Sequence, residues 1–136
     1  MINIQAQMKE LFGNSCLAYC YAAYITGNIS DVKYLTRIMM NGWLDGFIDD
    51  DGFVSKPVQY INSWAAKLIR DIVRHEIQSF KDLPKGQWVV EMKLTRDAKA
   101  SHFVIASRSG IIFDPSGDSV TAQYGVPVSY RELIYA

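Results

Sequence analysis

The sequence changes its hydrophobic pattern near residue 71, and this change constrains the fold more than any other feature. Upstream, apolar residues recur every three or four positions, as on one face of an α-helix. Downstream, short β-branched and aromatic runs such as "QWVVEMKL" and "SHFVIAS" are separated by turn signals such as "KDLPKG". Helices followed by an antiparallel set of strands are typical of an α+β domain. We therefore predict N-terminal helices packed on a C-terminal twisted antiparallel sheet.

The predicted helices and strands have recognisable ends. Asn14 or Ser15 suits the N-cap of the first helix, Gly27 suits the residue after its end, and Ser30 suits the next N-cap. At least four antiparallel strands should follow residue 71. The final segment, "VPVSYRELIYA", is expected to be an edge strand or a short helix. The predicted helices cover residues 16–26, 31–40 and 57–70.

The composition excludes several classes of function. The chain has 136 residues with 14 basic and 14 acidic side chains, so its net charge is zero and the basic footprint of a nucleic-acid-binding domain is missing. No apolar run approaches the roughly 18 residues of a membrane span. The N-terminus "MINIQAQMKE" lacks the pattern of a signal peptide. No repeat or Pro/Gly-rich linker divides the chain. We expect a single cytoplasmic domain over residues 1–136 that binds neither nucleic acid nor membrane.

Cys16 has an unusual position for a buried apolar residue. In "GNSCLAYCYAAYITG" it follows a Gly-Asn-Ser turn, at the first position of the predicted helix. The unpaired N–H groups and the dipole at a helix N-terminus favour a thiolate, which is the nucleophilic form of cysteine. Cys20 lies one turn further on, and we interpret it as a core residue with no disulfide to Cys16. The two cysteines and two distant histidines form no zinc pattern, and no metal or organic cofactor is expected.

A hairpin in "SHFVIASRSGIIFDPSG" supplies possible partners for the cysteine. A three-residue loop at 108–110, whose glycine takes a positive φ, would pair Ser107 with Ile111. Continued along the strands, this register makes His102 and Asp114 diagonal neighbours on one sheet face, at roughly 7–8 Å between backbones. An imidazole and a carboxylate span that distance. The pattern predicts a nucleophile, a base and a residue that orients the base.

Three stretches resemble the papain-like cysteine peptidases, especially the small bacterial branch related to peptidases that cleave double-glycine leaders from bacteriocins. "NSCLAYCYAAYITG" is similar to the nucleophile helix of that branch, and "SHFVIASRSGIIFDPSG" to its His strand, turn and Asp-Pro ending. "INIQAQ" is similar to its opening strand, which ends in a glutamine. The resemblance implies a Cys16–His102–Asp114 triad and an oxyanion donor, either Gln7 or Gln5, beside the Cys16 backbone N–H.

The chain departs from that family at two positions near the nucleophile. Leu17 stands where the family usually has a glycine, and Glu10 occupies the strict papain spacing for the oxyanion glutamine. The expected function is thiol-dependent hydrolysis of a peptide or isopeptide bond in a peptide or protein substrate. The alternatives are a transglutaminase-like acyl transferase and a catalytically silent papain-like binding module. The sequence does not indicate the oligomeric state.

Two further features invite a functional interpretation that we do not favour. His75, in "VRHEI", has no obvious acidic partner on a later strand, and we interpret it as a solvated strand position. The stretch "DGFIDDDGFV" at 45–54 is similar to a calcium loop. However, aligning Gly52 with the invariant glycine of such a loop puts Phe47 and Val58 at ligand positions. An exposed turn at Asp51 and Gly52 is the better interpretation.

Overall fold

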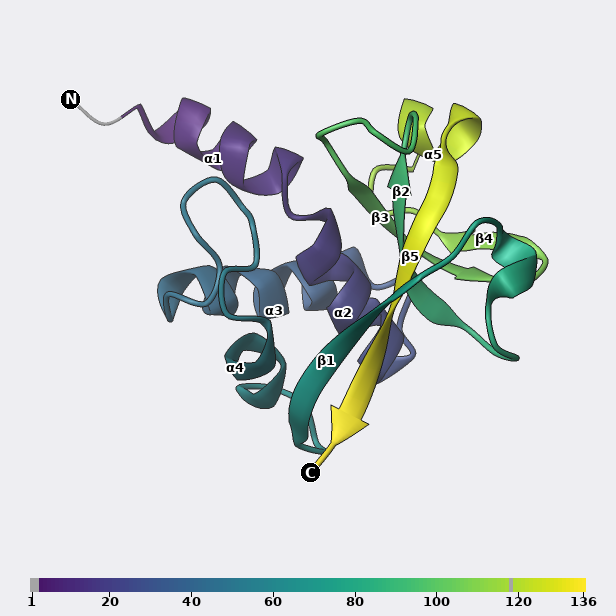
Figure 1. Cartoon of the computed structure of the whole chain (residues 1–136). Coiled ribbons are helices and arrows are strands. Elements are labelled where there is room, and N and C mark those ends of the chain that lie inside the picture. Colours follow the sequence, from purple (N-terminus) through teal and green to yellow (C-terminus); the bar gives the residue numbers. More distant parts are fainter. Residues whose placement is uncertain (1–2, 118) are drawn as a thin grey trace.

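Residues 3–117 and 119–136, which the computed structural model describes, form the predicted α+β arrangement of helices and an antiparallel sheet (Figure 1). The four helices that precede the first strand belong to the N-terminal half, and the five strands belong to the C-terminal half. Helix α2 (Cys16–Thr26) packs against the sheet on one side and against α3 (Val32–Leu44) on the other. The first residue of α2 is therefore held between the two halves of the fold.

The predicted helix at 16–26 is confirmed, with Gly27 in the left-handed conformation at a φ of 71°. The second helix is longer than predicted. Its N-cap is Asp31 rather than Ser30, because the Asp31 carboxylate accepts the backbone N–H of Tyr34 at 3.1 Å.

Two other N-terminal segments differ from the predictions. The stretch expected as an opening strand is helix α1 (Ile4–Gly13), because Asn3 caps its first turn and Leu11 is fully buried. The third predicted helix is shorter than expected, since α4 covers only Pro57–Asn62. The Asn62 side chain donates to the carbonyl of Ile69 and accepts its N–H, so the chain turns and starts the first strand there.

The sheet contains β1 (Ile69–Glu76), β2 (Trp88–Lys93), β3 (His102–Ser107), β4 (Gly110–Phe113) and β5 (Val126–Tyr135). The strand order is β1-β5-β2-β3-β4, and all pairs are antiparallel. The interpretation of the final segment as an edge strand or a short helix is wrong. β5 lies between β1 and β2, with hydrogen bonds to both. Two short helical segments were not predicted, namely the 3-10 turn η1 (Phe80–Asp82) and helix α5 (Val120–Tyr124).

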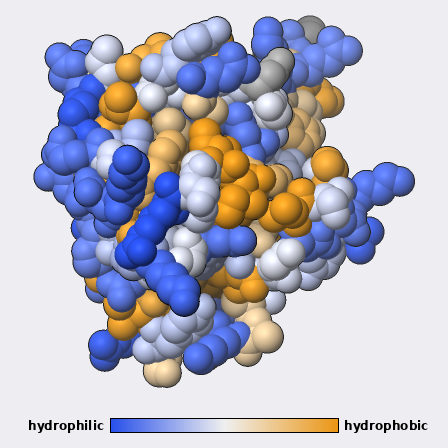
Figure 2. Space-filling view, turned by 90° about the vertical axis from the view of Figure 1, so that its right-hand side faces the viewer, coloured by the Kyte–Doolittle hydropathy of each residue, from blue (hydrophilic) through white to orange (hydrophobic). Residues whose placement is uncertain are grey.

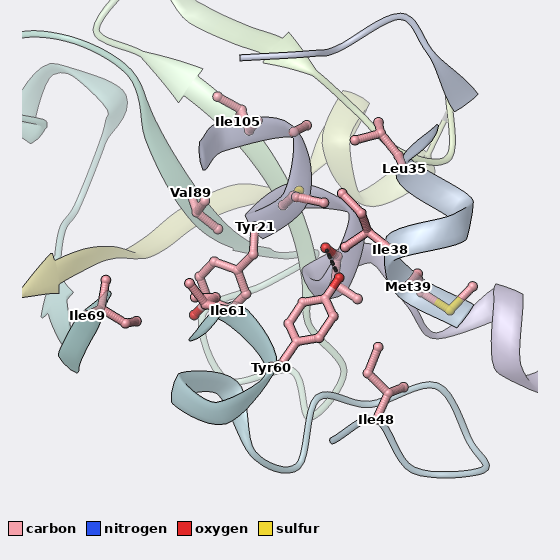
Figure 3. Close-up of a cluster of buried hydrophobic side chains, with 14 of the residues drawn as sticks. Tyr21, Leu35, Ile38, Met39, Ile48, Tyr60, Ile61, Ile69, Val89 and Ile105 are labelled. Carbon is pink, nitrogen blue, oxygen red and sulfur yellow. Dashed lines mark hydrogen bonds between the residues drawn. The ribbon is translucent and has the colours of Figure 1, made fainter. Parts of the chain in front are cut away.

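The main core lies between the helices and one face of the sheet (Figure 3). Tyr21 from α2 and Tyr60 from α4 are its largest fully buried side chains. The Tyr60 hydroxyl donates to the carbonyl oxygen of Ala18 at 3.1 Å, so that α4 is tied to the middle of α2. This bond helps to fix the helix that carries Cys16.

A second, smaller core covers the other face of the sheet, where η1 and α5 pack. From the sheet side of the molecule, hydrophobic residues gather in the middle of the surface among hydrophilic ones (Figure 2). None of the helices within residues 3–117 and 119–136 is long and apolar enough to cross a membrane.

The segment between α3 and α4 forms the predicted turn at Asp51 and Gly52. The carboxylate of Asp49 accepts the N–H groups of Asp51 and Phe53, both at 3.0 Å. Gly52 has a φ of 93° and packs against the carbonyl oxygen of Leu11, at the end of α1. This contact places Phe53 beside the N-terminus of α2. In the described part of the chain, no three His, Cys, Asp or Glu side chains could together hold a metal ion.

Candidate active site

Cys16 is the first residue of α2, at a helix end with free N–H groups. Ser15 is the N-cap residue, but its hydroxyl donates to the carbonyl of Phe12 at 3.0 Å and makes no capping bond in the described structure. The first-turn N–H groups of α2 are thus left for another acceptor. A negative charge on the cysteine, or on an oxygen bound beside it, would be stabilised there.

The β3–β4 hairpin brings His102 and Asp114 together in a way that the sequence predicted only in part. The predicted pairing of Ser107 with Ile111 is wrong, because Ser107 pairs with Gly110 across a two-residue turn. A bulge at Ile112 then inserts one residue, and Ile105 pairs with Phe113. The pairing of Ile105 with Phe113 is the one that the predicted three-residue loop would also give. The glycine of the loop has the predicted positive φ, at 123°.

The ring of His102 and the carboxylate of Asp114 form a short bond in a largely buried position. His102 Nε2 lies 2.7 Å from Asp114 Oδ1, and the two side chains are 12% and 11% exposed. The backbone N–H groups of Ser116 and Ser119 also donate to this carboxylate, at 3.0 and 3.3 Å. Asp114 is therefore held in place independently of the histidine, as a residue that orients a ring should be.

Cys16 and His102 line the same pocket, and the thiol affects the pKa of the ring. Burial alone would lower this pKa, but the interactions with the Cys16 thiol and the Asp114 carboxylate outweigh it and raise the pKa above the ordinary value of 6.5. Because Nε2 is engaged with Asp114, Nδ1 is the nitrogen left for the thiol. A thiol, an imidazole and a carboxylate thus stand in series, an arrangement that can activate a nucleophile.

Cys16 and His102 line one pocket with a volume of about 390 Å³. Its walls come from the start of α2, the segment around Phe53 and the loop before β3. Apolar side chains dominate, and Lys99 is the one lysine, arginine or acidic side chain among the described lining residues. The lining consists of Gly13, Asn14, Cys16, Leu17, Phe53, Val54, Lys99, Ala100, Ser101, His102 and Phe103.

The structure does not bring the predicted oxyanion glutamine to this pocket. Gln7 lies in α1, where its side-chain amide donates to the carbonyl oxygen of Asp50, and it lines a different pocket beside Trp43. Gln5 is an exposed residue of the same helix. Asn14, which the sequence suggested only as a helix cap, does line the pocket. The sequence feature that could have identified Asn14 as a pocket residue is its position two residues before Cys16.

The two remaining cysteine and histidine residues lie outside this arrangement. Cys20 is a fully buried free thiol, so the predictions of a core position and of no bridge to Cys16 are confirmed. The interpretation of His75 as lacking an acidic partner is wrong, since its Nε2 lies 2.8 Å from Glu132 Oε1 on β5. That second pair is 38% and 42% exposed, more than three times the exposed fractions of the His102–Asp114 pair.

Comparisons of the chain with protein-family models, with curated proteins and with solved structures find no match.

Proposed function

We propose that this protein is a thiol-dependent hydrolase with a papain-like fold, which cleaves a peptide or isopeptide bond in a peptide or protein substrate. One observation carries the proposal. Two segments far apart in the sequence, the start of α2 and the β3–β4 hairpin, bring Cys16 and His102 together at one pocket, and Asp114 Oδ1 lies 2.7 Å from the His102 ring. A His–carboxylate pair that served stability alone would not need a thiol at a helix N-terminus beside it.

In the proposed reaction, Asp114 holds a proton on His102 Nε2, and Nδ1 takes the proton of the Cys16 thiol. The thiolate attacks the substrate carbonyl carbon, and an oxyanion forms. The imidazolium then protonates the leaving amine as the C–N bond breaks, which leaves a thioester on Cys16. Water attacks the thioester with His102 as base, and the carboxylic acid product and the free thiol are released.

The oxyanion would be stabilised by groups that line the pocket. The backbone N–H of Cys16 belongs to the uncapped first turn of α2. Asn14 offers a side-chain amide as the second donor, in the role that the resemblance assigned to a glutamine. No step of this reaction needs a metal or an organic cofactor.

The pocket lining indicates the substrate side chains that fit best. Leu17, Phe53, Val54 and Phe103 offer apolar contact, and Phe53 is 55% exposed before any substrate binds. An extended peptide with an apolar side chain beside the cleaved bond would bury this surface. The free thiols of Cys16 and Cys20 fit a reducing compartment, and we place the protein in the cytoplasm.

A catalytically silent binding module is the second candidate. The observation that favours it is the distant position of Gln7, together with Leu17 after the cysteine. In such a module, Cys16 would react like an ordinary thiol, because binding alone does not require His102 to activate it.

Alkylation by iodoacetamide separates the two candidates. In a Cys20→Ala background, the rate at Cys16 is measured from pH 5 to 9 in native and in urea-unfolded protein. The hydrolase should react at pH 6 on the order of tenfold faster when native, and His102→Ala should remove that advantage. Equal native and unfolded rates would favour the silent module. Peptide-library cleavage with and without added amines then distinguishes hydrolysis from transglutaminase-like transfer.

A further inference from the structure

A buried carboxylate lies beside the candidate active site and takes no part in the proposed reaction. Glu91 on β2 is only 8% exposed. Val89, two residues earlier, belongs to the core under the helices, so Glu91 lies on the same face of the sheet. A charge in this position is costly to bury unless it is fully paired.

The partners of Glu91 come from separate elements. Ser101, in the loop before β3, donates its hydroxyl to Oε2 at 2.6 Å. Ser129 on β5 donates to Oε1 at 2.7 Å. Arg74 on β1 and Arg131 on β5 approach Oε1 at 3.3 and 3.7 Å. Burial would raise the pKa of Glu91, but these hydroxyls and guanidinium groups outweigh it and lower the pKa.

One arm of this network runs through Arg131. Burial raises the pKa of Tyr21 to about 12, and the charge of Arg131 opposes the increase. Arg131 also donates to the Ser129 hydroxyl at 2.6 Å. Tyr21 lies on the helix that begins with Cys16. Arg131 thus pairs with Glu91 and Ser129 on the sheet, and its charge acts on a tyrosine of the helix that carries Cys16.

The other arm reaches the residue before His102. Ser101 lies in the wall of the pocket, and His102 is the first residue of β3, where it pairs with Met92. The ends of strands fray unless they are tied down. The hydrogen bond from Ser101 to Glu91 restrains the backbone at this end of β3. It therefore also restrains the backbone of His102, from which the imidazole ring extends.

We propose that Glu91 is a positioning residue: through Ser101, it fixes the start of the strand that carries His102, and so holds the ring beside Cys16. The inference rests on the proposed function, because it concerns the coupling of those two side chains. It assigns to Ser101 a role beyond stability, whereas Ser129 only helps to satisfy the same carboxylate.

The test compares two serine variants that each remove one hydroxyl from Glu91. In the Cys20→Ala background, the pH profile of Cys16 alkylation and the free energy of unfolding are measured for Ser101→Ala, Ser101→Thr and Ser129→Ala. Ser101→Ala should reduce the alkylation rate at pH 6 by on the order of tenfold. Ser101→Thr, which keeps the hydroxyl, should restore it. Ser129→Ala should lower stability and leave the profile unchanged.

Two results would overturn the proposal, and they have different meanings. If wild type shows fast alkylation at pH 6 and Ser101→Ala shows the same profile, Glu91 has a structural role only, and the proposed function stands. If wild type itself reacts no faster than the unfolded chain, the coupling of Cys16 to His102 is absent. The proposed function then fails, and the positioning role fails with it.

Discussion

The substitution Asp114→Asn tests the electrostatics of the candidate site without adding or removing bulk. The carboxylate accepts His102 Nε2 and two backbone N–H groups. An asparagine oxygen can still accept from the ring and from Ser116, but the amide nitrogen faces the N–H of Ser119 as a second donor. The variant therefore keeps the shape of the turn and loses the negative charge.

The size of the effect should depend on pH. The raised pKa of His102 means that the pairing stabilises the fold fully below about pH 6.5, the ordinary value, and that this part is lost as the pH rises through the folded-state pKa. A hydrogen bond to a charged group contributes about 1.5–3 kcal/mol and a neutral one about 0.5–1.5 kcal/mol. Because the carboxylate is charged at both pH values and only the ring titrates between them, we expect Asp114→Asn to cost about 2–3 kcal/mol at pH 5.5 and about 1 kcal/mol less at pH 9.

Urea denaturation at pH 5.5 and pH 9 measures these free energies. The matched control is Glu132→Gln, which neutralises the carboxylate of the half-exposed pair with His75. That pair should contribute at most about 1 kcal/mol at either pH, because solvent screens it. If Asp114→Asn costs the same at both pH values, the carboxylate does not stabilise the imidazolium, and the reasoning about the triad is wrong.

Three further predictions concern other parts of the fold. Gly52→Ala should lower the free energy of unfolding by about 2–3 kcal/mol, because Gly52 has a φ of 93° and a Cβ there would collide with the carbonyl oxygen of Leu11. An unchanged urea midpoint would contradict this. Cys20 should resist iodoacetamide until urea unfolds the chain, since burial raises the pKa of its thiol; mass spectrometry of labelled native protein checks it, and rapid native labelling would count against it. Tyr60→Phe should cost about 1 kcal/mol, because it deletes the bond to the Ala18 carbonyl. Equal stability of wild type and variant would show that this bond contributes nothing.

The sequence was sufficient where the signal is local. The spacing of apolar residues and the glycine at position 27 determine α2, and they place Cys16 at its first turn. Short β-branched runs predicted the strands after residue 71, where most of β1 and all later strands lie, because alternation and turn residues act within a few positions. His102 and Asp114 were found for the same reason, since a hairpin brings together residues that are close in sequence.

Only the tertiary structure decided the features that depend on distant contacts. β5 is central because it pairs with β1 and β2, which end 50 and 33 residues before it begins, and no local pattern encodes those partners. Gln7 is drawn to Asp50 by the packing of α1 against a loop 43 residues away. The bulge at Ile112, which aligns His102 with Asp114, is likewise set by the packing of the sheet. Such contacts depend on the assembled core, and so the sequence suggested the candidate site residues while the fold determined which of them meet.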